Sequence, residues 1–228
     1  MGKSPVHYQQ MIEIVPTVVP ESLEDIIAVV ERYKSFATRI HVDVADGKFA
    51  PNTTWMPKEG DRLPPGMEYE IHMMVADPHE MGLEYAKAGA HSLIGHVEAF
   101  GSAMTAQLAY DAWKGAGIRE VQAAALFQTP VEALSPYVPM SDYILLMTIA
   151  SIGVQGIPFE EEGIERIRRF HELYPDAKIA VDGGVSLKNI DRLAAAGACH
   201  CCAGSSISRA EDPAKAYADL IALGNSAV

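Results

Sequence analysis

The feature that most constrains the fold is a regular alternation of short β-rich runs with amphipathic runs of helix length, which continues along the whole chain. Eight runs have the length and the apolar content of buried parallel strands. They are Glu13–Val18, Arg39–Val44, Tyr69–Met74, Ser92–His96, Glu120–Leu126, Tyr143–Thr148, Lys178–Asp182 and His200–Ala203. Eight units in 228 residues leave about 28 residues for each, which is about the smallest length of a parallel βαβ unit. We therefore predict a (β/α)8 TIM barrel that spans residues 1–228 as a single domain.

An open, doubly wound α/β sheet is the alternative arrangement of such units. A sheet of that kind carries a G-x-G-x-x-G turn after its first strand, whereas Val18-Val-Pro-Glu21 follows the first strand here. The barrel is therefore the more economical fold. Residues 51–65 carry four prolines and interrupt the alternation after the second strand. We expect a loop with a short helix there, close to the strand ends where barrel active sites lie.

Capping residues and glycines indicate where the helices begin and end. Five positions carry side chains that cap helix N-termini: Ser22, Asp77, Ser102, Ser186 and Asp212. Three glycines stand where a left-handed residue ends a helix shortly before a strand: Gly89, Gly115 and Gly197. The resulting order of strand, loop, helix, glycine and strand agrees with the barrel.

The net charge of −12 and a pI near 5.0 limit the partners. Because acidic residues are spread through the sequence, the long-range field repels polyanions, and we expect neither nucleic acid nor a membrane surface as a partner. A small anion held by backbone N–H groups remains compatible with this charge. The cysteines, Cys199, Cys201 and Cys202, lie too close together for a disulfide framework. With no targeting segment or membrane span apparent, we predict a cytoplasmic protein.

Four side chains of the kinds that bind metals lie at the C-terminal ends of candidate strands. In Ile40-His-Val-Asp-Val44, His41 and Asp43 alternate with branched apolar residues, so both point to one side of the strand. His72 lies at the end of the third strand and Asp182 ends the seventh. Two imidazoles and two carboxylates suit one divalent ion such as Zn2+, Fe2+, Mn2+ or Co2+, and burying two aspartates without a cation is unfavourable. The alternative is four unrelated buried polar residues.

A second group of residues is rich in glycine. Gly183 and Gly184 follow the seventh strand, and Gly204 and Ser205 follow the eighth. Loops at these two positions, with free N–H groups, are the usual phosphate-binding site of a barrel. Tight βα turns also require glycine, so the pattern alone leaves both explanations open.

Two further groups of polar residues have simpler explanations. We expect His96 and Glu98, at the end of the fourth strand, to have hydrogen-bonded structural roles, and support of a metal ligand is the alternative. Cys199, His200, Cys201 and Cys202 alternate between two faces of one strand, so they cannot converge on a single metal ion, and we expect them to pack.

Six segments resemble ribulose-phosphate 3-epimerases in order and spacing, over a stretch from about Ile14 to about Leu220. They are His41-Val-Asp-Val-Ala-Asp-Gly-Lys-Phe-Ala-Pro-Asn52, Ile71-His-Met-Met74, His96-Val-Glu-Ala99, Thr129-Pro-Val-Glu-Ala133, Val181-Asp-Gly-Gly-Val185 and Ala203-Gly-Ser205. The resemblance implies a metal-dependent epimerase that inverts C3 of a phosphorylated ketose. It also implies a small phosphorylated sugar as the partner and a homo-oligomeric assembly.

The resemblance also implies roles for individual residues. His41, Asp43, His72 and Asp182 match the family's metal ligands, and Asp43 and Asp182 match the proton acceptor and donor on opposite faces of the inverted carbon. A cation stabilises the charge of the enediolate that forms between the two proton transfers. Met74 and Met147 match methionines that cushion the enediolate. The contacts to substrate and phosphate are expected from His72, Gly153, Gly156, Gly183, Gly184, Gly204 and Ser205.

The departures from the family pattern lie around the expected substrate. Pro20, which has neither a hydroxyl nor an N–H, stands where we expect a substrate-contacting serine, and Leu126 replaces an asparagine. Ala150-Ser-Ile-Gly-Val-Gln-Gly156 replaces a glycine-rich loop. We hypothesise that the metal site and proton-transfer residues are retained while the substrate has changed. The alternatives are an epimerase or isomerase of an unphosphorylated carbonyl compound and a non-catalytic phosphosugar-binding barrel.

Overall fold

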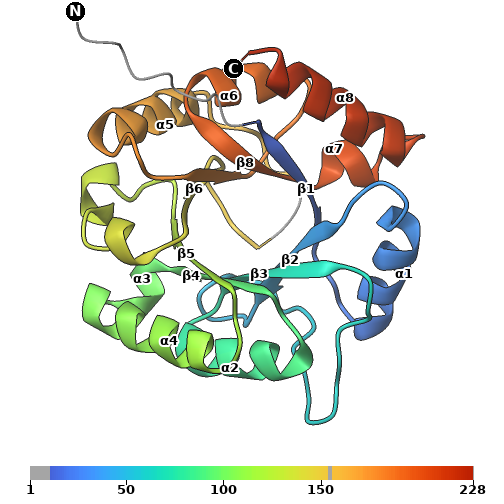
Figure 1. Cartoon of the computed structure of the whole chain (residues 1–228), viewed down its shortest axis with the longest axis vertical. Helices are drawn as coiled ribbons and strands as arrows, with labels where there is room; N and C mark the ends of the chain where they lie inside the picture. Colours follow the sequence, from blue (N-terminus) through green and yellow to red (C-terminus); the bar gives the residue numbers. More distant parts are fainter. Residues whose placement is uncertain (1–10, 154–155, 228) are drawn as a thin grey trace, which may run out of the picture.

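Eight parallel strands close into a barrel in which each strand pairs with its neighbours in chain order (Figure 1). The computed structural model describes residues 11–153 and 156–227. The strands are β1 (Glu13–Val18), β2 (Arg39–Ala45), β3 (Glu68–Met74), β4 (Ser92–His96), β5 (Glu120–Ala125), β6 (Tyr143–Met147), β7 (Ile179–Asp182) and β8 (Ala198–Ala203). The pairing of β1 with β8, from Glu13 opposite His200 to Pro16 opposite Ala203, completes the ring. The predicted (β/α)8 barrel is confirmed.

Helices form the outer layer around the strands (Figure 1). They are α1 (Leu23–Tyr33), α2 (Pro78–Ala88), α3 (Val97–Phe100), α4 (Ala103–Gly115), α5 (Glu162–Leu173), α6 (Ile190–Ala195), α7 (Ser205–Ser208) and α8 (Pro213–Asn225), with 3-10 turns η1 (Val131–Leu134) and η2 (Val138–Met140) after β5. The short helix expected within residues 51–65 is absent, because the four prolines of that segment disfavour helical hydrogen bonding. That segment is a loop from β2 to β3.

Four of the five predicted helix starts are confirmed. The confirmed caps, whose side chains accept a backbone N–H of the first turn, are Ser22, Asp77, Ser102 and Asp212. The prediction for Ser186 is wrong, since α6 begins at Ile190 after Asn189, and the Ser186 N–H instead donates to the Asn189 side chain. The sequence misplaced this start because a turn separates β7 from the helix.

Two of the three predicted glycine stops lie where expected. Gly89 caps α2 with φ of 103°, and Gly197, which follows the C-cap residue Ala196 of α6, has φ of 112°. The prediction for Gly115 is wrong, because Gly115 is the last residue of α4 and Gly117, two residues later, has the positive φ of 101°. Either glycine could have ended this helix on sequence grounds.

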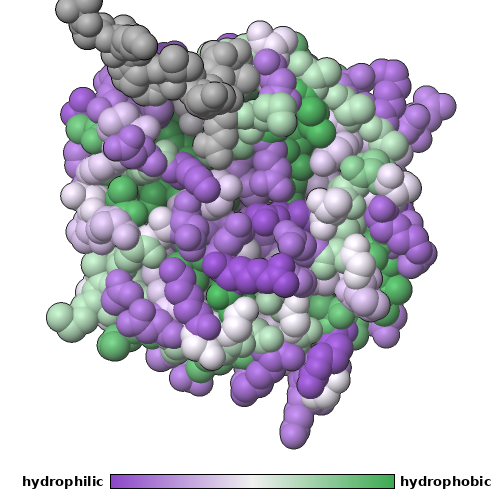
Figure 2. Space-filling model, viewed as in Figure 1, coloured by the Kyte–Doolittle hydropathy of each residue, from purple (hydrophilic) through white to green (hydrophobic). Residues whose placement is uncertain are grey.

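The interior of the barrel has an apolar side and a polar side. The apolar side is formed by Ile94, Ala124, Leu145, Met147, Ile149, Ala180 and Cys202. The polar side consists of fully buried residues of β2, β3, β4, β5 and β8: His41, Glu70, His72, His96, Gln122 and His200. Figure 2 shows hydrophilic residues gathered over the middle of the barrel as well. Because buried polar groups require partners, the polar side is the part of the core that calls for a specific explanation.

Between strands and helices the packing is apolar and tight. A Cβ on Gly82 of α2 would lie 2.3 Å from the ring of Trp113, so the absence of a side chain there lets α2 and α4 approach. Within the described residues, no helix combines the length and the hydrophobicity needed to cross a membrane.

Candidate active site

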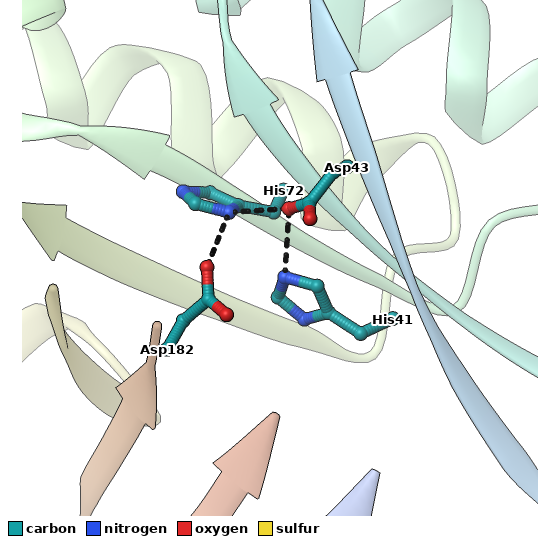
Figure 3. A group of neighbouring side chains, drawn as sticks. All are labelled: His41, Asp43, His72 and Asp182. Carbon is teal, nitrogen blue, oxygen red and sulfur yellow. Dashed lines mark hydrogen bonds and ion pairs between the residues drawn. The ribbon is translucent and has the colours of Figure 1, made fainter. Parts of the chain in front are cut away.

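Four polar side chains from three strands meet inside the barrel (Figure 3). His41 and Asp43 come from β2, His72 from β3 and Asp182 from the end of β7. His72 Nδ1 lies 2.9 Å from Asp43 Oδ1 and 3.5 Å from Asp182 Oδ2. His41 Nε2 lies 3.2 Å from the same oxygen of Asp43. The structure thus brings together the four residues that the sequence placed at strand ends.

The donor atoms of this cluster fit a divalent cation. Both histidines are fully buried, and Asp43 and Asp182 are only 7% and 9% exposed. His41 Nε2 is buried without a hydrogen-bond partner in the part of the chain that the structure describes, although it faces the carboxylates. Such an atom is unfavourable unless something satisfies it. One ligand atom from each residue lies within 4.8 Å of the others, and two imidazoles with two carboxylates form a common set of donors for Zn2+ or Fe2+.

Without a cation, protons on the neighbouring histidines balance the negative charges of the two carboxylates. Burial acts to raise the pKa of Asp43, but the neighbouring imidazoles of His41 and His72 hold that pKa well below its ordinary range. Burial acts to lower the pKa of His72, whereas hydrogen bonds with Asp182 and Asp43 raise it overall. A cation and these protons therefore compete for the same lone pairs, as they do in protein metal sites generally.

Glu70, on β3, fixes the orientation of His41. Its Oε1 lies 2.6 Å from His41 Nδ1 and 3.1 Å from His200 Nε2, and its Oε2 accepts a 2.7 Å hydrogen bond from Gln122. The Cys202 thiol lies 3.2 Å from the same nitrogen of His41. Because an ionised carboxylate only accepts, His41 carries its proton on Nδ1 and presents the lone pair of Nε2 to the cluster. A carboxylate behind a histidine is the usual outer partner of a metal ligand.

A pocket extends from the two aspartates to the loops after β6, β7 and β8. Its lining includes every residue that the sequence assigned to proton transfer, phosphate binding or the methionine cushion, except His72: Asp43, Met74, Met147, Gly153, Gly156, Asp182, Gly183, Gly184, Gly204 and Ser205. His72 is fully buried and contacts both aspartates. The glycines and the cluster therefore belong to one site.

Comparison with known proteins identifies the family. The model of the ribulose-phosphate 3 epimerase family matches residues 13–208 of this chain. The chain belongs to the ribulose-phosphate 3-epimerase family. The predicted resemblance and the prediction of a carbohydrate epimerase are confirmed.

Curated relatives and solved structures agree with this assignment. The chain is 31% identical over 186 residues to ribulose-phosphate 3-epimerase of Schizosaccharomyces pombe, covering 79% of each protein. It is 30% identical over 220 residues to the cytoplasmic isoform of this enzyme from Oryza sativa subsp. japonica, covering 91% of this chain and 92% of that one. The fold resembles 3-hexulose-6-phosphate synthase from Salmonella typhimurium, with a TM-score of 0.69 and 16% identity over 95% of this chain and 100% of that chain.

The residue of β1 that lines the pocket of this epimerase-family protein is Thr17 rather than Pro20. Pro20 lies beyond the end of β1, and its carbonyl accepts a 2.8 Å hydrogen bond from the Trp55 N–H, which ties down the long loop after β2. Thr17 is 4% exposed and lines the pocket with Asp43. Pro20 is not part of the pocket lining, because it follows the end of β1. The signal for Thr17 was a polar residue near the C-terminal end of an otherwise largely apolar strand.

In the loop after β6, Gly153 crosses the loop after β2 at Asn52, and Gly156 lies beside Arg209 at the end of α7. A Cβ on Gly153 would lie 2.1 Å from Asn52 Oδ1, and the φ of Gly153 is 97°, so this crossing requires glycine. A Cβ on Gly156 would lie 3.5 Å from Arg209 Nη2. The sequence identified the two glycines of this loop but missed Arg209, the cation beside them.

Proposed function

We propose that the protein is a metal-dependent epimerase that inverts C3 of a ketose phosphate, either D-ribulose 5-phosphate and D-xylulose 5-phosphate or a related pentulose or hexulose phosphate. The observation that carries this proposal is that Asp43 and Asp182, from strands that are not neighbours, line one pocket and both contact His72. Two carboxylates on one pocket suit a reaction in which one group removes a proton and another returns it. Membership of the family supports the same class of reaction.

In the proposed reaction the two aspartates act on opposite faces of C3. Asp43, whose pKa is held low by His41 and His72 against the effect of burial, remains ionised and accepts the proton. Asp182 donates a proton to the other face, and the roles reverse in the opposite direction. Met74 and Met147, both buried on the pocket wall, exclude water from the reacting carbon and offer it a polarisable surface.

The proposed metal site consists of His41, Asp43, His72 and Asp182, which would hold one Zn2+, Fe2+, Mn2+ or Co2+ ion. The two histidines contribute neutral nitrogen donors, and the two aspartates contribute the negative charge that balances the cation. When bound, such an ion supplies positive charge beside the oxygens of the enediolate. This site leaves the opposite end of the pocket for the phosphate.

Solvent deuterium exchange tests the proposed reaction. After metal analysis of the purified protein, a panel of ketose phosphates that includes ribulose 5-phosphate and allulose 6-phosphate is incubated in D2O and followed by proton NMR. We expect loss of the C3 proton signal at a rate close to that of epimerisation, because abstraction at C3 precedes inversion. No exchange with any sugar, despite a full metal site, would contradict the proposal. Exchange with unphosphorylated ketoses alone would show that phosphate is not part of the substrate.

Arg209 is proposed to hold the phosphate together with the glycine loops. Its guanidinium lies beside Gly156, which lines the pocket, and has no carboxylate partner among the residues that the structure describes. We expect Arg209→Ala to raise the KM for the phosphorylated substrate by about 10- to 100-fold with little change in kcat, as removal of a hydrogen bond to a charged group typically does. Steady-state kinetics measures this.

The control for Arg209 is a second exposed arginine. Arg192 bonds Glu161 at 2.6 Å and the Lys188 carbonyl, neither of which lines the pocket, so Arg192→Ala is expected to leave KM within about twofold. Inhibition by inorganic phosphate should weaken in parallel with the KM of Arg209→Ala. An unchanged KM in that variant would show that backbone N–H groups hold the phosphate without this side chain.

A further inference from the structure

A second buried histidine lies directly behind His72. His96, the last residue of β4, places its Nε2 2.9 Å from Nε2 of His72, on the ring nitrogen that does not face the aspartates. The two rings stack with centroids 5.0 Å apart and 26° between their planes, and both side chains are fully buried. At this distance one nitrogen must donate and the other accept. The proton position on one ring therefore decides that on the other.

Glu98, in the short helix α3, determines which nitrogen donates. His96 Nδ1 lies 3.3 Å from Glu98 Oε2, and a carboxylate only accepts. The other oxygen of Glu98 accepts from the Leu126 N–H at 3.0 Å and from the Thr129 hydroxyl. Because Glu98 Oε2 can only accept, His96 carries a proton on Nδ1, and a neutral imidazole with its proton there offers Nε2 as an acceptor.

We propose that His96 and Glu98 are positioning residues that fix the tautomer of His72 so that its Nδ1 presents a lone pair to a cation. Because His96 Nε2 accepts, His72 must carry a proton on Nε2. Once a cation displaces the proton that His72 shares with Asp43, Nδ1 is the nitrogen left to bind. The inference rests on the proposed metal site but does not depend on which sugar the enzyme binds.

A glutamate carboxylate then orients each of the two histidines of the cluster, in one case directly and in the other through an intervening histidine. Glu70 contacts His41 directly, whereas Glu98 acts on His72 through His96. The longer connection is anchored outside the metal cluster, since Leu126 belongs to the loop after β5. Full burial of His96 keeps water from replacing it as the acceptor. Outer partners of this kind typically contribute 10- to 100-fold in metal affinity.

Glu98→Gln provides the decisive test, because it inverts the hydrogen-bond polarity without changing the shape of the side chain. The amide oxygen must face the Leu126 N–H, so the amide NH2 faces His96 Nδ1 and forces it to accept. His96 Nε2 then donates, and His72 must keep its proton on Nδ1. We expect the dissociation constant for Zn2+, measured by competition with a chromophoric chelator without substrate, to rise by about 10- to 100-fold.

Two further variants separate positioning from mere structural support. Glu98→Ala removes the acceptor without imposing a donor, so it should weaken Zn2+ binding less than Glu98→Gln does. Thr129→Val removes one hydrogen bond to Glu98 but leaves the contact with His96 intact, so it should leave the dissociation constant within about twofold. Equal or greater weakening in Glu98→Ala than in Glu98→Gln would overturn the proposal, since loss of packing would then explain both.

Nitrogen-15 NMR of the Zn2+-loaded wild-type protein gives an independent measurement. We expect the His72 ring to carry its proton on Nε2 and the His96 ring to carry its proton on Nδ1. A His96 ring protonated on Nε2 would overturn the proposal even if the enzyme is fully active. Absence of epimerase activity with the expected tautomers would instead contradict the proposed reaction and leave the positioning role in place.

Discussion

Substitution of Asp43 by Asn is expected to lower the rates of C3 proton exchange and of epimerisation by about three orders of magnitude or more. The amide has no basic oxygen to accept the C3 proton, and it removes one of the two negative charges beside His41 and His72. NMR exchange rates and turnover are compared at a metal concentration that saturates the variant. Loss of activity is then not a consequence of an empty metal site.

The companion variant Asp182→Asn distinguishes proton transfer from a general effect on the site. If each aspartate serves one face of C3, this variant loses epimerisation but still exchanges the C3 proton of the epimer from which Asp43 abstracts. Asp219→Asn, on the exposed surface of α8, is the control and should retain full activity. Exchange by Asp43→Asn at the wild-type rate with the same epimer would show that another group is the base.

Strand positions could be predicted closely because barrel strands are buried on both sides. Glu13–Val18 and Ser92–His96 were predicted with the bounds that the structure has. The last strand begins at Ala198, two residues earlier than predicted, because Cys199 is partly exposed and alternation with Cys201 gave no clear start. Buried strands give continuous apolar runs, so errors arise where a run contains polar or partly exposed residues.

The four residues of the cluster could also be predicted, because Asp43, His72 and Asp182 lie in the C-terminal halves of their strands and His41 shares a strand face with Asp43. In a closed parallel barrel these ends meet on one face, so no knowledge of side-chain contacts was needed to bring His41, Asp43, His72 and Asp182 together. The glycines of the pocket followed from the same rule. Position along a strand therefore carried most of the information about the site.

What the sequence could not give is the set of partners behind the cluster. The pairs His72–His96, His41–Glu70 and Glu98–Leu126 join residues that are 24, 29 and 28 positions apart. Whether such pairs are bonded depends on strand register and rotamer, which no local pattern encodes. The alternation of side chains along the last strand does predict that Cys199 and Cys201 face away from His200 and Cys202. It could not show that the Cys202 thiol contacts His41.

Glu70→Leu is expected to lower the free energy of unfolding by about 3–5 kcal/mol, the typical result of removing one partner from a buried charged network. The carboxylate is fully buried and accepts from His41, His200 and Gln122, and Arg39 Nη1 lies 3.8 Å away. Leucine removes the acceptor that these groups share at the centre of the network. Denaturant unfolding of the metal-free protein at pH 6 measures the change, with Glu70→Gln as a milder variant that keeps one oxygen.

The same network predicts how stability depends on pH. Burial acts to raise the pKa of Glu70, but His200 and His41 hold it well below its ordinary value of 4.5, so its stabilisation is present above that pH and is lost as the pH falls. Burial acts to lower the pKa of His200, but Glu70 raises it well above 6.5, so its stabilisation is present below that pH and is lost as the pH rises. Wild-type protein should therefore be most stable between the two values, and Glu70→Gln should show a flatter profile.

Glu68→Gln is the matched control, because Glu68 is on the same strand and also pairs with Arg39. Its side chain is 42% exposed, with ion-pair distances of 3.1 Å to Arg39 and 3.2 Å to Arg119. Exposed pairs contribute at most about 1 kcal/mol, so this variant should remain close to wild type at every pH. Burial of the carboxylate among three donors is what distinguishes Glu70 from Glu68. Equal losses of unfolding free energy in Glu70→Leu and Glu68→Gln would therefore contradict the stabilising role of the buried network.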